Sequence, residues 1–346
     1  MRPARPRTVF KLLLAITFIG GATAGSVFAE TGKAPAQTER KKMLAIAIHG
    51  GAGVISRNQL GPDDGASYRE GLAAALDAGY AVLEKGGSSL DAVTAAVRLL
   101  EDNPLFNAGK GAVLAHDGSA QLDASIMDGR NLAAGAVTGV RTIKNPIDLA
   151  RRVMEDSPHV FLSGAGAEEF ARERGFTSVP NDYFITPTRK RQLERVLQGR
   201  TQPRNELQGL GTVGAVAVDA QGNVAAATST GGMTNKRWGR IGDAPVIGAG
   251  TYANNASCAV SSTGHGEYFI RSVVAYDICA LVEYRNWTLE QAVREVVHGK
   301  LVQRGGEGGV IAVDPRGNVS MQFNSPGMFR GMRDSSGRCE IAIYEK

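Results

Sequence analysis

Apolar residues recur at helical spacing in several separate stretches of the chain. The longest stretch runs from Ala66 to Lys85 and stops at Gly86-Gly87, which predicts one amphipathic helix. A second helix is expected from Ser88 to about Glu101, because Ser88 and Asp91 have the spacing of a helix cap. Further helices are predicted over residues 145–156, 165–174, 267–283 and 288–299.

Short apolar runs bounded by turn residues predict strands. The run 44–48 predicts a buried strand that enters a glycine turn at His49–Gly53. Two hairpins are expected at 213–228 and 309–323, each with an Asp-x-x-Gly turn, and a shorter strand pair at 112–127. Strands towards both ends with helices between them favour an α+β fold, in which layered sheets are covered by helices.

The segment 181–211 shows neither the helical spacing of apolar residues nor a short apolar run typical of a strand. It contains Pro187 and Pro203, the basic cluster Arg189-Lys190-Arg191 and a polar run over 198–208. Prolines and polar residues without an apolar face are typical of connecting segments. We therefore expect a flexible linker over about 181–211.

The first 29 residues have the order of a secretory signal peptide. A basic start with Arg2, Arg5, Arg7 and Lys11 is followed by an apolar run and then by small residues up to Ala29. We expect cleavage after Ala29 and an exported protein, periplasmic or secreted. An uncleaved N-terminal anchor is the alternative. No later run is long enough to cross a bilayer, so no membrane association is expected once the signal is removed.

The signal segment also accounts for most of the net charge. The whole chain carries +5, and residues 1–29 contribute four basic side chains and no acid, which leaves the remainder close to +1. Such a surface offers few cations to neutralise phosphates, so we expect no nucleic-acid partner.

Three cysteines, Cys258, Cys279 and Cys339, lack the CxxC spacing of zinc or redox sites. An oxidising compartment would permit one disulfide. Because a chain of this size can bury a large core without a disulfide, we expect mostly buried free thiols, with a single disulfide as the alternative.

Common hydrolase signatures are missing from the sequence. It contains no GxSxG, no HExxH, no P-loop, and no GxGxxG after a strand. The five histidines, which lie far apart and without metal-ligand spacing, are His49, His116, His159, His265 and His298. The sequence therefore argues against a metalloenzyme and against a Ser-His-Asp enzyme.

Thr212 stands between the expected linker and the first strand of a hairpin. A threonine hydroxyl is a poor nucleophile unless a base lies beside it. The residue's own α-amino group, with a reference pKa of about 7.7–8.0, could be that base if the Gly211–Thr212 bond were cut. Glycine at 211 tolerates the strained backbone that favours attack on the preceding carbonyl.

Eight sequence blocks occur in the order typical of one enzyme family. They are His49–Gly53, Asn103–Gly109, Leu122–Gly129, Gly211–Val216, Thr228–Gly232, Gly239–Asp243, Tyr252–Asn255 and Ser262–Glu267. On these blocks the chain resembles the plant-type asparaginases, also called isoaspartyl peptidases, of the N-terminal-nucleophile hydrolase superfamily. The resemblance covers nearly all of the chain after the signal segment. It implies the four-layer αββα sandwich of that superfamily.

The resemblance implies autocatalytic cleavage between Gly211 and Thr212. The products would be an α chain of about 30–211 and a β chain of 212–346, which form one catalytic domain. Thr212 would be the nucleophile, and Thr230 would support it by hydrogen bonds unless it is an ordinary strand-end threonine. Thr263 and Gly264 would stabilise the tetrahedral oxygen as an oxyanion hole.

The resemblance also assigns substrate-binding residues. Arg240 and Asp243 would bind the α-carboxylate and the α-ammonium of an aspartyl substrate, because a guanidinium can bind a carboxylate through two parallel hydrogen bonds. A surface ion pair is the alternative for these two side chains. Gly266 would contribute backbone contacts, and Asn107 would position groups near the nucleophile. His49 is interpreted as a structural residue rather than a base.

No cofactor is expected for catalysis. The loop 100–110 resembles the family's alkali-cation loop, which implies a structural sodium ion bound by backbone carbonyls. The carbonyls belong to Leu100, Glu101, Asn103, Phe106, Ala108 and Lys110. The resemblance further implies a homodimer of αβ units.

These residues predict an amidohydrolase that releases ammonia from L-asparagine and hydrolyses β-aspartyl dipeptides through a threonine acyl-enzyme. One alternative is a glycosylasparaginase, which cleaves sugar–asparagine amides and usually has aspartate where Gly211 stands. The other is a non-catalytic periplasmic protein that binds aspartyl ligands. Arg237-Trp238 place unusual bulk and charge beside the expected substrate site.

Overall fold

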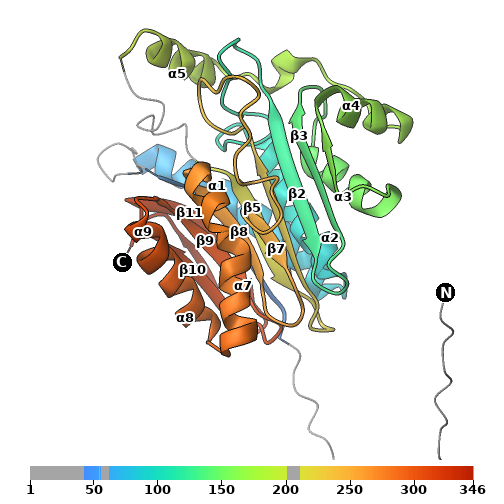
Figure 1. Ribbon diagram of the computed structural model, residues 1–346, viewed down its shortest axis with the longest axis vertical. Coiled ribbons are helices and arrows are strands. Elements are labelled where there is room, and N and C mark those ends of the chain that lie inside the picture. Colours follow the sequence, from blue (N-terminus) through green and yellow to red (C-terminus); the bar gives the residue numbers. More distant parts are fainter. Residues whose placement is uncertain (1–42, 54, 56–61, 201–210, 346) are drawn as a thin grey trace, which may run out of the picture. The chain divides into compact units, whose positions relative to one another are not determined.

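The computed structural model describes residues 43–53, 55, 62–200 and 211–345. The expected signal peptide, residues 1–29, lies outside these ranges, as does part of the expected linker. Two β-sheets form the centre of the described part (Figure 1). The larger has eight strands in the order β12-β11-β1-β5-β6-β2-β3-β4, and the smaller has four in the order β10-β9-β8-β7.

The large sheet is built from both halves of the chain. Its strands are β1 (Ala45–Gly53), β2 (Leu122–Asp128), β3 (Ala134–Val140), β4 (Phe161–Ser163), β5 (Val213–Val218), β6 (Val224–Thr230), β11 (Gly327–Asp334) and β12 (Cys339–Ala342). All neighbours are antiparallel except β3 and β4, which are parallel. β1 and β5 are adjacent, so the start of the chain pairs with the strand that follows Thr212.

The small sheet contains β7 (Thr251–Ala253), β8 (Ala259–Gly264), β9 (Gly308–Val313) and β10 (Val319–Phe323). It packs face to face on the large sheet. Ala47 and Val216 of the large sheet share one buried cluster with Ile311 and Phe323 of the small sheet.

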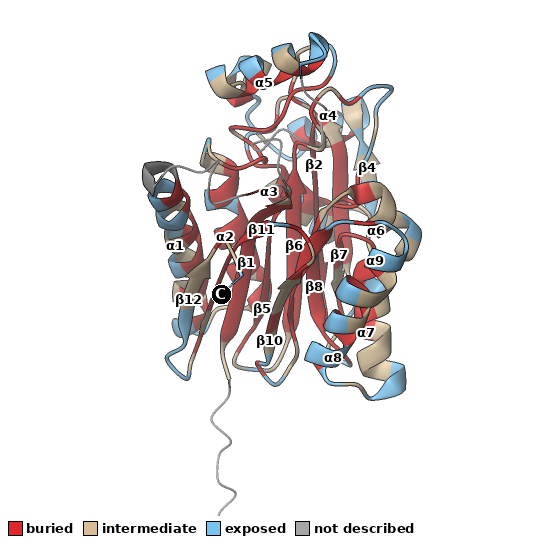
Figure 2. Cartoon of the chain, turned by 90° about the vertical axis from the view of Figure 1, so that its left-hand side faces the viewer, coloured by how far each residue is buried: buried red, intermediate tan, exposed pale blue. Residues whose placement is uncertain are grey.

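Helices cover the two outer faces of this pair of sheets. α1 (Pro62–Glu84), α2 (Ser89–Asp102) and α3 (Pro146–Asp156) pack on the large sheet. α7 (Val274–Arg285) and α8 (Leu289–Arg294) pack on the small sheet. Figure 2 shows these layers edge-on, with buried strands between helices whose outer faces are exposed. The architecture is therefore the expected four-layer αββα sandwich.

Several predicted elements are confirmed. Ser88 caps α2, because its side chain accepts a hydrogen bond from the Asp91 amide at 3.1 Å. Both Asp-x-x-Gly hairpins form, as β5–β6 and β9–β10. Helices also occupy the predicted ranges near 145 and 165, as α3 and α4 (Gly164–Glu173).

Two strand predictions were wrong in detail. The glycine turn at residues 49–53 does not form, because β1 continues through Gly53 with a bulge after His49 that keeps it paired with β11. The predicted strand at 112–116 is reduced to a single bridge between Leu114 and Ala120. Its backbone bonds elsewhere instead: the His116 amide donates to the Lys236 carbonyl at 3.0 Å.

The linker prediction was also wrong for its described part. A short 3₁₀ helix (Asn181–Phe184) precedes the helix α5 (Pro187–Leu197), which lies beyond one end of the sheets (Figures 1 and 2). Arg189 of the basic cluster is buried and donates to the Gly111 carbonyl at 2.5 Å. Residues 201–210 lie outside the described part.

The predicted helix over 267–283 is interrupted at one residue. Val273 has φ 49°, which ends α6 (Gly266–Ser272) before α7 begins. The final predicted helix extends beyond its expected end, as α8 is followed by a π-helical stretch (Glu295–Lys300) and α9 (Leu301–Gln303). No helix among the described residues is both long and apolar enough to cross a membrane.

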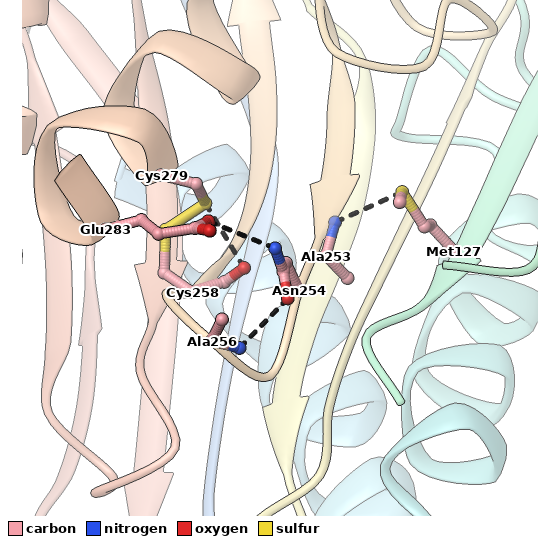
Figure 3. The surroundings of a disulfide bond; sticks show 7 residues. All are labelled: Met127, Ala253, Asn254, Ala256, Cys258, Cys279 and Glu283. Carbon is pink, nitrogen blue, oxygen red and sulfur yellow. Dashed lines mark hydrogen bonds between the residues drawn. A yellow bond between two sulfur atoms is a disulfide. The ribbon is translucent and has the colours of Figure 1, made fainter. Parts of the chain in front are cut away.

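The expectation of mostly buried free thiols was wrong. Cys258 and Cys279 form a disulfide with a Cα–Cα distance of 5.4 Å, and Cys339 is free but exposed. Figure 3 shows the disulfide joining α7 to the turn before β8, beside a hydrogen bond of 3.2 Å from Asn254 to Glu283. The disulfide therefore fixes α7 to the strand that ends at Gly264.

Candidate active site

Thr212 lies directly before β5, in the layer between the two sheets. The β5–β6 register pairs Val213 with Ser229, so the next step along the strands places Thr212 opposite Thr230. Both threonines are buried. The amide nitrogen of Thr212 donates to Thr263 Oγ1 at 3.2 Å. The predicted nucleophile, its neighbour and the predicted oxyanion residue thus meet at one place.

The backbone before Thr212 is tightly enclosed. Gly211 has φ +60°, a conformation in which side chains are strained. A Cβ at this position would also meet the Gly51 Cα, the Ala52 nitrogen at 2.7 Å and Thr263 Oγ1 at 2.8 Å. Only glycine fits between β1 and Thr263. The peptide that would be cut is therefore held in place by its surroundings.

Thr263 is fully buried near the end of β8. Its hydroxyl oxygen accepts hydrogen bonds from the amides of Ala52 and Thr212, both at 3.2 Å. A hydroxyl has one proton and two lone pairs, so a group that accepts two bonds still has its proton to donate. Gly264 follows directly and ends β8. A hydroxyl and a neighbouring backbone amide are the kinds of group that form an oxyanion hole.

His49 contacts the backbone of the nucleophile and not its hydroxyl. Its Nδ1 lies 2.8 Å from the Thr212 carbonyl oxygen, and its Nε2 lies 2.9 Å from Ser261 Oγ. A carbonyl can only accept, so Nδ1 carries the proton and Nε2 accepts from the serine. Burial lowers the His49 pKa to about 3, which keeps the ring neutral. His49 therefore orients Thr212, as a structural residue would.

Asn107 holds the turn that follows Thr230. Its Nδ2 donates to the Gly232 carbonyl at 2.9 Å, and its Oδ1 accepts from the Val113 amide at 2.9 Å. The Gly232 amide in turn donates to Thr230 Oγ1 at 3.0 Å. Thr230 Oγ1 thus accepts one bond from the chain and retains its own proton for a neighbour. Asn107 is fully buried and acts on the turn.

The predicted substrate residues form a second group next to this one. A Cβ at Gly266 would lie 2.8 Å from Asp243 Oδ1 and 3.0 Å from Arg240 Nη2. A Cβ at Gly232 would lie 3.6 Å from Arg240 Nη1. Because Gly232 also bonds Thr230, the Arg240–Asp243 pair adjoins the nucleophile.

Asp243 is buried, and its Oδ2 has no hydrogen-bond partner among the described residues. Burial raises the Asp243 pKa to about 7, although the charge of Arg240 acts in the opposite direction. A buried carboxylate without a full set of partners is suited to bind an ammonium group. The α-ammonium of an aspartyl substrate would supply it.

One partner of this group was missed at the sequence level. Glu267 accepts two hydrogen bonds from Arg240, from Nε to Oε1 and from Nη2 to Oε2, both at 2.9 Å. Glu267 belongs to one of the quoted blocks, but only its spatial contact gives it a role. It fixes the guanidinium plane, with Nη1 directed towards Gly232 and Gly242.

The loop 100–110 folds back on the end of α2. The Lys110 amide donates to the Glu101 carbonyl at 2.7 Å, and the Phe106 amide donates to the Asn103 carbonyl at 3.3 Å. Each carbonyl has a second lone pair, and the end of a helix carries partial negative charge. Glu101 is also fully buried, and its Oε2 has no hydrogen-bond partner among the described residues. These groups are oxygen donors of the kind that a hard cation such as sodium requires.

The geometry brings together every residue predicted for catalysis and substrate binding. The backbone nitrogen of Thr212 lies beside the Thr263 hydroxyl, and the Arg240 cation and the Asp243 carboxyl group lie next to them. Such an arrangement can hold a zwitterionic amino acid and attack an amide carbonyl in its side chain.

The chain is similar to known proteins over most of its length. Residues 42–343 match the family model described as Asparaginase. The chain is 54% identical over 308 residues to the isoaspartyl peptidase of Escherichia coli (strain K12). The aligned region covers 87% of this chain and 96% of that protein. It is 44% identical over 300 residues to the isoaspartyl peptidase/L-asparaginase of Xenopus laevis, with coverage of 86% and 94%. For the isoaspartyl peptidase/L-asparaginase of Mus musculus the identity is 46% over 287 residues, with coverage of 82% and 86%.

The family match spans most of the chain and contains the whole of the site described above. The chain therefore belongs to the asparaginase family of N-terminal-nucleophile hydrolases.

Proposed function

We propose that this protein cleaves its own Gly211–Thr212 bond and then hydrolyses L-asparagine and β-aspartyl dipeptides. The observation that carries the proposal is the contact of 3.2 Å between the Thr212 nitrogen and Thr263 Oγ1, next to the Arg240–Asp243 pair. The relatives named isoaspartyl peptidase/L-asparaginase support the same pair of substrates.

In the first step the Thr212 hydroxyl attacks the Gly211 carbonyl. The peptide nitrogen leaves as the α-amine of Thr212, and water hydrolyses the ester that has formed. The Thr263 hydroxyl is a donor next to this peptide, since its Oγ1 lies beside both Gly211 and the Thr212 nitrogen. The products are chains of about 30–211 and 212–346.

In the mature enzyme the α-amine of Thr212 takes the hydroxyl proton, and the oxygen attacks the substrate's side-chain carbonyl. Thr263 and Gly264 stabilise the tetrahedral oxygen by hydrogen bonds. The amine returns the proton to the leaving group, which departs as ammonia or as an amino acid. Water then hydrolyses the β-aspartyl ester and regenerates Thr212. Thr230 supports the hydroxyl from the opposite strand.

Substrate recognition rests on opposite charges. Arg240 binds the α-carboxylate through the side of its guanidinium group that faces Gly232 and does not bond Glu267. Asp243 binds the α-ammonium, while Gly266 leaves room for the ligand beside both. Asn107 maintains the turn between the clamp and the nucleophile.

The contacts around Gly211 argue against the glycosylasparaginase alternative, because those enzymes usually have aspartate at this position and only glycine fits here. An aspartate there would place its side chain against the Ala52 nitrogen and Thr263 Oγ1. A glycosylated asparagine used as substrate separates the two activities directly, since we expect turnover of asparagine and none of the glycoside.

Intact-mass spectrometry and N-terminal sequencing of the purified protein test the scheme. We expect two chains, the smaller of which begins at Thr212, together with ammonia release from asparagine. The Thr212→Ala variant should remain one inactive chain. A wild-type chain that stays whole and releases no ammonia would instead indicate a protein that only binds aspartyl ligands.

We also propose that the protein is exported. The order of residues 1–29 supports a cleaved signal. The Cys258–Cys279 disulfide supports an oxidising compartment, because disulfides persist there. Cell fractionation with N-terminal sequencing should yield a periplasmic or secreted protein that begins at Glu30.

We further propose a structural sodium ion in the loop 100–110 and pairing of two αβ units. The carbonyls of Leu100, Glu101, Asn103, Phe106, Ala108 and Lys110 would hold the ion, with no part in the chemistry. Thermal unfolding in sodium and in tetramethylammonium salts tests the first proposal. Light scattering tests the second.

A further inference from the structure

Lys236 is a buried cation for which the reaction scheme has no role. The residue is 6% exposed, and its side chain only 2%. Lysine is rarely buried to this extent without a paired charge. Burial lowers the Lys236 pKa, and the nearby charge of Asp123 opposes that change.

The ammonium group of Lys236 contacts the start of β2, next to the residue that pairs with Thr230. Its Nζ donates to the Gln121 carbonyl at 2.8 Å and lies 4.0 Å from Asp123 Oδ2. Asp123 and Thr230 are directly paired in the β2–β6 register. The other carboxylate oxygen of Asp123 accepts from Thr138 Oγ1 at 2.6 Å and from the Gly139 amide at 2.9 Å. The anchor for Lys236 is therefore itself fixed to the sheet.

The backbone of Lys236 belongs to the segment that carries the substrate clamp. Between the end of β6 at Thr230 and the start of β7 at Thr251, the chain forms no helix or strand. Arg240 lies one turn beyond Lys236, as its amide donates to the Arg237 carbonyl at 2.9 Å. A Cβ at Gly232 would lie 3.0 Å from Lys236 Nζ and 3.6 Å from Arg240 Nη1. The Lys236 ammonium and the Arg240 guanidinium thus both lie close to Gly232.

We propose that Lys236 is a positioning residue that sets the distance between the Arg240–Asp243 clamp and the Thr212 nucleophile. The clamp lies on irregular backbone, and Lys236 ties that backbone to the strand beside Thr230. The distance selects substrates whose reactive carbonyl lies on the β-carbon, as in asparagine. Glutamine and γ-glutamyl substrates carry the carbonyl one methylene further from the clamp and do not align with Thr212. This inference rests on the proposed function.

The test compares Lys236→Met with the wild type, using asparagine and glutamine as the two probes. Self-cleavage needs no clamp, so the variant should still yield a chain beginning at Thr212. We expect kcat for asparagine to fall by about tenfold or more, because small errors in alignment are costly in rate. The preference for asparagine over glutamine, as a ratio of kcat/KM, should fall by about tenfold as well.

Two further variants make the result decisive. Lys300→Met breaks another lysine–aspartate pair, with Asp277 at 2.8 Å on the far side of the small sheet, and should leave the asparagine preference unchanged. The double variant Asp123→Asn/Lys236→Met removes the carboxylate left without its cation and should recover stability without recovering the preference. It also replaces the single variant if that variant does not fold.

Three results would overturn the proposal. The first is a folded, self-cleaved Lys236→Met protein with the wild-type asparagine preference. The second is recovery of the preference together with stability in the double variant, which would make Lys236 a folding residue only. The third is a wild-type protein that neither cleaves itself nor hydrolyses asparagine, which would remove the proposed function on which the inference depends.

Discussion

The Thr212 nitrogen lies 3.2 Å from Thr263 Oγ1, although the two residues belong to opposite sheets. In the proposed scheme, the Thr263 hydroxyl that donates to the substrate is therefore also a partner of the atom that becomes the catalytic base. The same oxygen accepts the Ala52 amide from β1, so three strands converge on one side chain. Small shifts between the sheets would alter the base and the oxyanion site together.

Thr263→Val should leave a folded protein with little activity. Valine has nearly the same shape but removes the hydroxyl, which would donate to the tetrahedral oxygen and which accepts the Ala52 and Thr212 amides. Loss of one such donor typically lowers kcat by about 100-fold to 1,000-fold. Steady-state ammonia release measures this loss, and the rate at which the precursor band disappears on a gel measures the effect on self-cleavage. A variant with wild-type kcat would exclude Thr263 from the oxyanion site.

Gly211→Ala should slow self-cleavage strongly, because a methyl group at this position meets β1 and Thr263. Gly199→Ala is a matched control. Gly199 also has positive φ, +68°, but a Cβ there would have nothing within 4 Å. Both variants carry the backbone strain, and only the first carries the clash. Mass spectrometry measures the rate of self-cleavage in both variants. Equal rates would contradict the close packing of β1 and Thr263 around Gly211.

Substrate binding should weaken in acid. Burial raises the Asp243 pKa to about 7, with Arg240 lowering it and Glu267 raising it. In the proposed scheme the Asp243 carboxylate binds the substrate ammonium, and protonation below this range removes its charge. Well below pH 7, protonation of Asp243 should lower kcat/KM for asparagine about tenfold per pH unit, partly through KM, in addition to the loss caused by protonation of the Thr212 amine. Asp243→Asn should remove the contribution of Asp243 to the pH dependence of kcat/KM and leave only the contribution of the Thr212 amine.

Loss of the Cys258–Cys279 disulfide should lower stability while sparing the chemistry. Its cysteines are 21 residues apart, and closing such a loop stabilises a chain by about 3 kcal/mol. The Cys258→Ala/Cys279→Ala variant, placed in an uncleaved Thr212→Ala background, permits denaturant unfolding of a single chain. Cys339→Ser in the same background is the control, since Cys339 is free. An unchanged unfolding midpoint in the double variant would show that the disulfide does not stabilise this protein.

The layers of the fold could be predicted because they follow from local pattern. Ser88 capping α2 and the Asp-x-x-Gly hairpins depend on neighbours in sequence. The site could be predicted for a different reason. Thr212, Arg240 and Asp243 lie in sequence blocks that the resemblance assigns as a set, whereas their spacing along the chain says nothing of their contact.

What the sequence did not provide depends on contacts between distant segments. Glu267 acquires its role only where α6 meets Arg240. Arg189 was expected in a flexible linker, but α5 turns it onto the Gly111 carbonyl. Cys258 and Cys279 pair because α7 lies across the turn before β8, and cysteine spacing does not encode this. No local rule could supply these three results.

The fit around Gly211 has a consequence for the newly made chain. As long as the peptide is whole, its backbone lies against Thr263, where the carbonyl of a substrate would have to bind. The precursor's site is thus occupied by its own chain, and in the proposed scheme hydrolysis of this bond both creates the amine and frees the space. Activation and unblocking are one chemical event. On that scheme, a population of this enzyme would hold only closed zymogens and fully competent molecules.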